Sequence, residues 1–397
     1  MHLDIFSTGD YYLGMEKPSA TLAANLRRLR DARGWSQTSL AEQAGMSRAG
    51  YRKIELGESS PRSSTLQELA RVLGVSLASL LRPVPHLSLV RFRSRKRLNS
   101  REQVLAQVAD WLSNFSQLEE RLAEQKPFQL ADLMRRDMAG GVSPAALAGM
   151  VRKALSLDEV EPIRDICGLL ESAGVKVLSI NIATDAFFGL SVSREDGGPA
   201  VVVNTWERIA VERWIFTAAH ELGHLLLHMD AYDAAESGER SGEEKEADSF
   251  AAHFLLPEGA FRKEWAASAG LGFVDRVLKL KRMFRVSYRT ALYRLSEYRS
   301  FGSQVWARFQ AEYARQFGRT LQKTDEPDGL QADAFRAATE RAAEEPDGLS
   351  PSDFAEDRLH LLVRRAIERE LITLGRGAEV LGIGVGEMRA LASSWVE

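Results

Sequence analysis

Two histidines, four residues apart, flank a glutamate in the stretch TAAHELGHLLLHM, Thr217 to Met229. On a helix, His220 and His224 lie about 40° apart around the axis and one turn apart along it, so both imidazoles can reach one metal ion. Glu221 lies about 100° from His220, where its carboxylate can take a proton from a metal-bound water. The spacing indicates the helix of a zinc hydrolase. A buried helix with two hydrogen-bonded histidines is the competing interpretation.

A third protein ligand would favour the zinc site, and a second predicted helix offers candidates. The residue six positions past His224 is Asp230, which excludes the pattern with three histidines. In EEKEADSFAAHFLLP, Glu244 and Asp248 are four residues apart and share a helix face. Glu244 can then bind the ion while Asp248 accepts a hydrogen bond from a ligand histidine. Glu246 lies about 200° around the axis from Glu244 and is the alternative ligand.

Other polar residues near this helix have weaker arguments for a role. His228 is one turn beyond His224, and we expect it to orient a loop or to pack in the core. His253 lies about 180° around the axis from Glu244 and is expected to be structural. The pattern does not identify the group that stabilises the oxyanion, for which His228 and Tyr232 are candidates.

The N-terminal part of the chain is strongly basic. Between Ala20 and Asn99 there are 15 Lys and Arg against 5 Asp and Glu, whereas the net charge of the whole chain is only −3. The remainder must therefore be acidic. A basic segment on an acidic protein indicates nucleic-acid binding.

Apolar residues recur at helical spacing from Leu22 to Leu80 in this basic part. The runs break at glycines, which are Gly34, Gly45, Gly57 and Gly74. Five helices of about ten residues fit the pattern. In SLAEQAGMSRAGYRKIE, Gly45 stands at a tight turn and Ser47 at the N-cap of the next helix. This stretch predicts a helix-turn-helix.

This region resembles the xenobiotic-response-element (Cro/repressor-like) DNA-binding domains. The matching residues are Ser36-Gln37, Leu40-Ala41, Gly45-Met46-Ser47, Ile54-Glu55, Gly57, Pro61 and Thr65-Leu66. In such folds the second helix of the motif enters the major groove. We expect the DNA-binding residues to be Gln37, Ser47, Arg48, Ala49, Tyr51, Arg52 and Arg62, with Arg48, Ala49, Tyr51 and Arg52 towards the bases. The alternative is a helical protein–protein module.

The chain of 397 residues is long enough for at least two domains. With 45% hydrophobic and 27% charged residues, its composition is that of a soluble globular protein. No apolar run approaches the roughly 18–20 residues that span a bilayer, and the first residues lack the basic start of a signal peptide. The single cysteine, Cys167, excludes an internal disulfide. We expect a cytoplasmic protein without membrane contact.

Strand signals are confined to a middle region, in VKVLSINI, FFGLSVS and AVVVNT, and helical stretches follow them. This region is predicted to be α+β, and it contains both candidate metal-binding helices. The predicted regions are a helix-turn-helix domain at 18–82, a basic linker and helix at 83–126, the α+β domain at 127–298 and a helical domain at 299–397. The last region has a weak helix-turn-helix pattern and is interpreted as a helical cap or a dimerisation segment.

The α+β region resembles the ImmA/IrrE family of metallopeptidases over roughly Val160 to Tyr298. The matching segments are RWIFTAAHELGHLLLH, EKEADSFAAHFLLP and AVVVNT. The resemblance implies a thermolysin-like zincin fold in which His220, His224 and Glu244 bind Zn2+ and Glu221 is the catalytic base. It also implies a conditionally active zinc metallo-endopeptidase that cleaves a repressor and so releases genes from control.

The sequence therefore predicts a multidomain DNA-binding transcriptional regulator whose zinc-dependent endopeptidase domain cleaves itself or a partner regulator in response to a signal. Expected partners are a double-stranded DNA operator and a repressor or other regulator as protein substrate. Single-stranded DNA as an activator and a homodimer are further expectations. The alternative is a transcription factor whose metal-binding domain senses a ligand or partner without proteolysis. Glu221 favours the peptidase, because a binding module has no need of a base.

Overall fold

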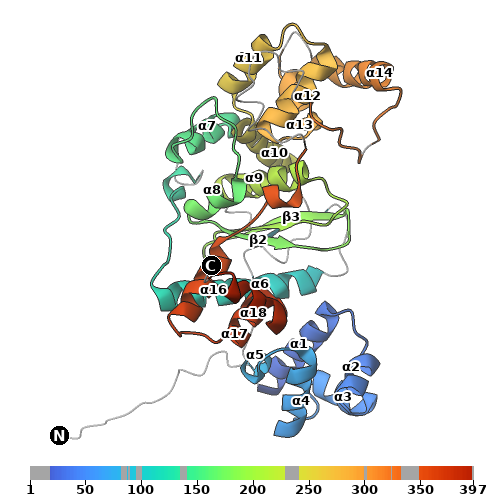
Figure 1. Cartoon of the computed structure of the whole chain (residues 1–397), viewed down its shortest axis with the longest axis vertical. Coiled ribbons are helices and arrows are strands. Elements are labelled where there is room, and N and C mark those ends of the chain that lie inside the picture. Colours follow the sequence, from blue (N-terminus) through green and yellow to red (C-terminus); the bar gives the residue numbers. More distant parts are fainter. Residues whose placement is uncertain are drawn as a thin grey trace, which may run out of the picture. The chain divides into compact units, whose positions relative to one another are not determined.

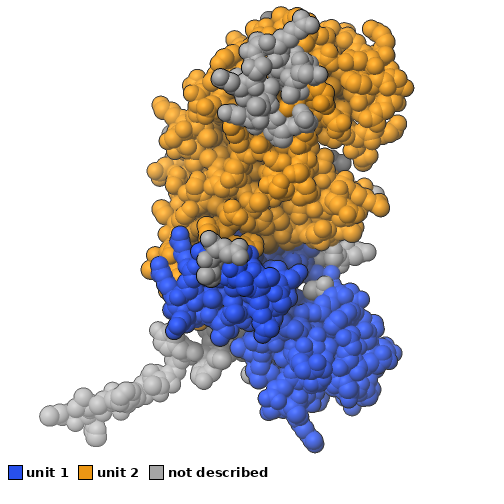
Figure 2. Space-filling view, in the orientation of Figure 1, with its two compact units in different colours: residues 1–86, 100–115, 363–397 blue, residues 87–99, 116–362 orange. Residues whose placement is uncertain are grey.

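The computed structural model describes residues 18–81, 87, 90–94, 101–134, 141–228, 241–298, 302–322, 324–331 and 348–395. The chain falls into two compact units, which Figure 2 shows in different colours. The first unit comprises residues 1–86, 100–115 and 363–397, and the second comprises residues 87–99 and 116–362. The N-terminal segment without signal-peptide character and Tyr232 lie outside the described residues. The division into regions at residues 82, 126 and 298 stays a prediction.

The first unit begins with five helices, as the glycine-separated pattern predicts (Figure 1). They are α1 (Pro18–Ala32), α2 (Gln37–Gln43), α3 (Arg48–Glu55), α4 (Ser63–Leu73) and α5 (Leu77–Leu81). Ser36 caps α2 by accepting a hydrogen bond from the amide of Ser39, and Ser47 caps α3 in the same way through the amide of Gly50. Gly45, between α2 and α3, has a φ of +63°, which glycine adopts without strain.

One face of α3 is buried in the core of this helical domain. Tyr51, Ile54 and Glu55 are spaced three and four residues apart, so they share one side of the helix, and all are buried. Glu55 pairs with Arg30 of α1, whose Nε lies 2.8 Å from Glu55 Oε2. Tyr51 is 0% exposed. The prediction that Tyr51 faces DNA bases is therefore wrong, because its side chain belongs to the inner face of α3.

The first unit also contains the C-terminal helices α17 (Leu374–Leu381) and α18 (Val385–Ser393). Gly382 ends α17 in the left-handed conformation with a φ of +67°. Two further helices, α6 (Arg101–Leu122) and α16 (Arg358–Glu368), contribute residues to both units. The expectation of a helical C-terminal region is confirmed.

The second unit contains a four-stranded mixed sheet with the strand order β1-β3-β4-β2. The strands are β1 (Val90–Ser94), β2 (Lys176–Ile180), β3 (Phe187–Val192) and β4 (Ala200–Asn204). β3 is antiparallel to both of its neighbours, whereas β2 and β4 are parallel. Three strands lie in the predicted segments, but β1 lies in the segment predicted as a basic linker. The expectation that strands are confined to residues 127–298 is therefore wrong.

In the second unit, α9 packs on β3 and β4, and α10 packs on α9 and α7 (Figure 1). The α-helices are α7 (Pro144–Ala154), α8 (Ile166–Ser172), α9 (Val211–Leu227), α10 (Ser241–Leu255), α11 (Glu258–Ala267), α12 (Phe273–Phe284), α13 (Tyr288–Ser296) and α14 (Val305–Phe317). Short 3-10 helices are η1 (Ala131–Leu133), η4 (Gly302–Gln304) and η6 (Pro351–Asp353). No helix in the described part of the chain is long and apolar enough to cross a membrane. The predicted α+β fold class is confirmed.

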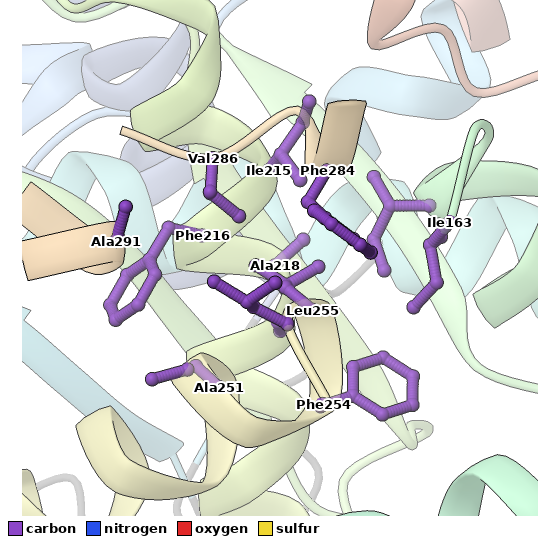
Figure 3. Packing of buried hydrophobic residues seen from close by; sticks show 14 of the residues in the cluster. Ile163, Ile215, Phe216, Ala218, Ala251, Phe254, Leu255, Phe284, Val286 and Ala291 are labelled. Carbon is purple, nitrogen blue, oxygen red and sulfur yellow. The ribbon is translucent and has the colours of Figure 1, made fainter. Parts of the chain in front are cut away.

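The core of the second unit lies between α9, α10 and the helices that follow them. Figure 3 shows side chains of one buried apolar cluster, among them Ile215 and Phe216 of α9, Phe254 and Leu255 of α10 and Phe284 of α12. All five side chains are at most 8% exposed. This apolar packing holds the two candidate metal-binding helices against each other, because burial of such side chains contributes about 1.5–3 kcal/mol each.

Gly189 of β3 is a point where the sheet and α9 approach too closely for a side chain. A Cβ atom added there would lie 2.6 Å from Thr217 Cγ2 of α9 and 2.7 Å from the carbonyl oxygen of Val202 on β4. We therefore expect Gly189→Ala to lower the free energy of unfolding by about 1–3 kcal/mol, the usual cost of overpacking.

The control for this prediction is Gly149→Ala in α7, where no atom lies within 4 Å of the added Cβ. Because alanine favours a helix over glycine, this change should stabilise the protein by at most about 1 kcal/mol. Urea unfolding of both variants measures the two effects. Equal free energies of unfolding for the two variants would contradict the close approach at Gly189.

Candidate metal centre and nucleic-acid interface

The two motif histidines lie on α9, which is buried along almost its whole length. Every residue of Val211–Leu227 except Arg213 is buried. His220 and His224 are both 0% exposed, and their Nε2 atoms lie 2.9 Å apart. The spacing of one helical turn thus brings both imidazoles to one point inside the second unit.

A carboxylate from α10 reaches the same point. Glu244 Oε2 lies 3.3 Å from His220 Nε2, and Glu244 Oε1 lies 3.2 Å from His224 Nε2. α10 can approach α9 this closely because Gly223 has no side chain: a Cβ atom there would lie 3.0 Å from the ring of Phe250. Among the described residues, these two histidines and Glu244 are the group whose ligand atoms lie within 4.8 Å of one another.

The chemistry of this donor set fits a zinc ion. Ligand atoms about 2.0–2.1 Å from a tetrahedral zinc lie roughly 3.4 Å from one another, close to the separations of 2.9, 3.2 and 3.3 Å found here. Burial lowers the pKa of His224 well below its usual value, so this imidazole is neutral and able to bind a metal. Burial raises the pKa of Glu244, but the contacts with the two histidines lower it more, so this carboxylate is ionised.

The remaining ring nitrogens of the two histidines also have partners. His220 Nδ1 lies 2.9 Å from Asp248 Oδ1 on α10. His224 Nδ1 lies 2.9 Å from His228 Nδ1, and His228 Nε2 lies 3.0 Å from Glu246 Oε2. Both Nε2 atoms can therefore face an ion while both Nδ1 atoms carry protons, because Asp248 and His228 can accept hydrogen bonds from the Nδ1–H groups.

Glu246 is not among the three residues whose ligand atoms converge. Glu246, the alternative third ligand, contacts His228, the residue that follows the end of α9. His228 is 6% exposed and joins Glu246 to His224 in one hydrogen-bonded series. His253 is elsewhere, with its Nδ1 atom 2.8 Å from the carbonyl oxygen of Ser249 in its own helix.

Glu221 follows the ligand candidate His220 in α9, and a hydrogen bond from the sheet holds its side chain. Its side chain is 0% exposed, and Ser191 of β3 donates a hydrogen bond of 2.9 Å to Glu221 Oε2. A Cβ atom on Gly189, two residues from Ser191 on the same face of the strand, would lie 3.4 Å from Glu221 Oε1. The carboxylate is thus positioned next to, and outside, the group of three donors.

Two residues of this site were missed by sequence reasoning. Ser191 orients Glu221, and Arg91 of β1 contacts α10, with Nη1 2.5 Å from Glu243 Oε2 and Nη2 3.2 Å from Glu244 Oε1. The alternation of apolar and basic residues in VRFRS is the period of a strand and could have revealed β1. Nothing in the local sequence indicates which helix Ser191 would meet.

The candidate nucleic-acid interface is the outer face of α3 and its surroundings. Arg48, Ala49 and Arg52 are exposed on α3, and Arg62 is exposed at the start of α4. The other two predicted residues have structural contacts. Ser47 caps α3, and Gln37 Nε2 donates a 3.0 Å hydrogen bond to Glu55 Oε1. Tyr51 points away from this face, as described above.

Two parts of the chain match known families. Residues 26–80 match the helix-turn-helix family, and residues 170–296 match the IrrE N-terminal-like domain of the M78 peptidases. The second match includes both histidines, Glu221 and Glu244 of the candidate metal centre.

Curated relatives are helix-turn-helix regulators. The chain is 41% identical over 69 residues to the HTH-type transcriptional regulator SutR of Escherichia coli (strain K12), a match that covers 17% of this chain and 39% of SutR. It is 40% identical over 57 residues to the SPbeta prophage-derived uncharacterized HTH-type transcriptional regulator YonR of Bacillus subtilis (strain 168), covering 14% of this chain and 53% of YonR.

A third relative is matched over most of its length. The chain is 32% identical over 82 residues to the uncharacterized HTH-type transcriptional regulator YqaE of Bacillus subtilis (strain 168), covering 21% of this chain and 71% of YqaE. The matches to SutR and YonR span only 39% and 53% of those proteins. With the two family matches, the relatives establish that the chain belongs to the helix-turn-helix transcriptional regulators and carries an IrrE N-terminal-like domain of the M78 peptidase family.

Proposed function

We propose that this protein is a DNA-binding transcriptional regulator whose second unit is a zinc-dependent endopeptidase that cleaves the chain itself or a partner regulator in response to a signal. The observation that carries the proposal is the convergence of His220, His224 and Glu244 beside the buried carboxylate of Glu221. Glu221 is held by a hydrogen bond from Ser191, and we infer that it serves as the catalytic base beside the metal ion.

His220, His224 and Glu244 would hold Zn2+, which supplies a Lewis acid that polarises the carbonyl group of the scissile peptide bond. Glu221 would accept a proton from the attacking water and later deliver it to the leaving amine. Ser191 positions Glu221 for this transfer by donating to its Oε2 atom. His220, Glu221 and His224 are 0% exposed, and electrostatic interactions are stronger in buried surroundings than in water.

The first unit would bring the protein to its operator. In helix-turn-helix proteins the second helix of the motif lies in the major groove and its first residues contact bases. The exposed Arg48 and Arg52 of α3 are suited to guanine edges, and Arg62 to the phosphate backbone. A repressor or other regulator as substrate, single-stranded DNA as activator, a homodimer and a cytoplasmic location remain predictions.

The metal ligands are tested by two carboxylate variants on the same helix. Glu244→Gln should lose bound zinc, because the amide carries no negative charge at the ion. Glu246→Gln is the matched control and should retain at least most of the zinc, since Glu246 pairs with His228, which is not one of the three proposed ligands. Elemental analysis of both purified variants measures the metal. Zinc retained by the first variant and lost by the second would reassign the third ligand.

The catalytic base is tested by Glu221→Gln. The amide has nearly the size of the carboxylate, so packing, zinc content and DNA affinity should survive. It cannot accept the proton of the water, and loss of such a base costs about 10²–10⁴-fold in rate. Cleavage of a partner regulator is the measurement, with zinc and DNA binding measured on the same preparation. Unchanged relief of repression in this variant would favour sensing without proteolysis.

The nucleic-acid interface is tested with Arg48→Ala and Arg52→Ala. If these side chains reach base edges, each change should reduce discrimination between the operator and other duplexes by about 1–3 kcal/mol. Arg71→Ala is the control, because Arg71 is an exposed residue of α4 that pairs with Glu68. Binding to both duplexes is measured over a range of salt concentrations. Equal weakening on every sequence would make the two arginines phosphate contacts.

A further inference from the structure

The strand β1 lies directly beside the strand that holds the proposed base. In the register of the sheet, Arg91 of β1 pairs with Ser191 of β3, and Val90 pairs with Val192. Ser191 is the residue that donates to Glu221. The segment Val90–Ser94 therefore runs along β3 at the level of the candidate catalytic site.

Within the sheet, β3 has one neighbour on each side, β4 and β1. A strand can form a hydrogen-bonded ladder along each of its two edges, and extended peptides are commonly bound by adding to a sheet edge. β1 takes up the edge of β3 that β4 leaves open. A peptide that adds to this edge in extended form must therefore replace β1.

The side chain of Arg91 ties β1 to the metal centre. Residues directly opposite in an antiparallel pair project from the same face of the sheet, so Arg91 projects from the face on which Ser191 contacts Glu221 of α9. Its guanidinium lies 2.5 Å from Glu243 Oε2 and 3.2 Å from Glu244 Oε1. The Arg91 side chain is 11% exposed. Two carboxylates thus form an acidic subsite for one basic side chain.

We propose that the site recognises an extended basic peptide segment along β3, and that residues 90–94 of this chain are its resident occupant. The inference rests on the proposed function and names its substrate class: an extended segment with an arginine opposite Ser191, received by Glu243 and Glu244. A substrate and β1 exclude each other. Since β1 follows the helix-turn-helix region in the chain, release of this segment regulates access to the site.

Peptide binding to the full zinc-loaded chain tests this competition. The labelled probe is the peptide LVRFRSR, the sequence of residues 89–95, and Glu221→Gln serves as the background that prevents its hydrolysis. If β1 occupies the site about nine-tenths of the time, Arg91→Ala should tighten probe binding about tenfold, because the resident strand is weakened. Arg319→Ala, at an exposed position, is the control and should leave the affinity unchanged.

The probe itself supplies the second arm. Replacing its first arginine by alanine should weaken binding about tenfold or more, because the acidic subsite then loses its partner. Fluorescence anisotropy measures all four combinations of the two proteins and two peptides. Equal affinity of the probe for the Arg91→Ala protein and its parent, or for the two peptides, would overturn the proposal.

Amide hydrogen exchange provides a measurement that does not depend on a substituted Arg91. In the Glu221→Gln protein with Arg91 intact, the amides of residues 90–94 should exchange slowly and should lose this protection when the probe is saturating. Protection that persists with bound probe would overturn the proposal. Failure of the proposed peptidase function would give a different result. The protein with Glu221 intact and the Glu221→Gln protein would then cleave equally, while the peptide-binding results stayed as predicted.

Discussion

Three polar side chains, His220, Glu221 and His224, are fully buried within a mostly apolar helix, and β3 and α10 of the second unit give them partners. Burial of such groups without partners would cost several kcal/mol. β3 supplies Ser191 to Glu221, and α10 supplies Glu244 to both imidazoles. Gly189 and Gly223 allow these elements to come near enough, because each lacks the side chain that would separate the layers. The same contacts that satisfy the buried groups create the candidate metal centre.

The parts of this arrangement that depend on local spacing were predictable from the sequence. The four-residue separation of the histidines places both rings on one side of the helix, and the angle of about 200° between Glu244 and Glu246 means that only one of these carboxylates can face them. Helix caps and glycine turns similarly predicted the helices between Pro18 and Leu81. In each case the signal is a short-range period or cap that the surrounding fold does not alter.

What was missed depends on contacts between residues far apart in the chain. Tyr51 was assigned to the DNA-facing side of α3, but its ring fills the core beneath that helix. Sequence reasoning missed the strand β1, because a basic segment after a DNA-binding domain is readily interpreted as a linker. Only its pairing with β3 makes this segment a strand. Ser191 became significant only when the packing of β3 on α9 brought it to Glu221. Sequence patterns alone do not contain these pairings.

The central claim is that one zinc ion lies between His220, His224 and Glu244, next to Glu221. Anomalous X-ray scattering at the zinc edge from crystals of the zinc-loaded protein tests it most directly. The account predicts one strong peak within bonding distance, about 2.0–2.2 Å, of both Nε2 atoms and of a Glu244 carboxylate oxygen. A peak bound through His228 and Glu246, or no peak at this site in zinc-loaded crystals, would contradict it.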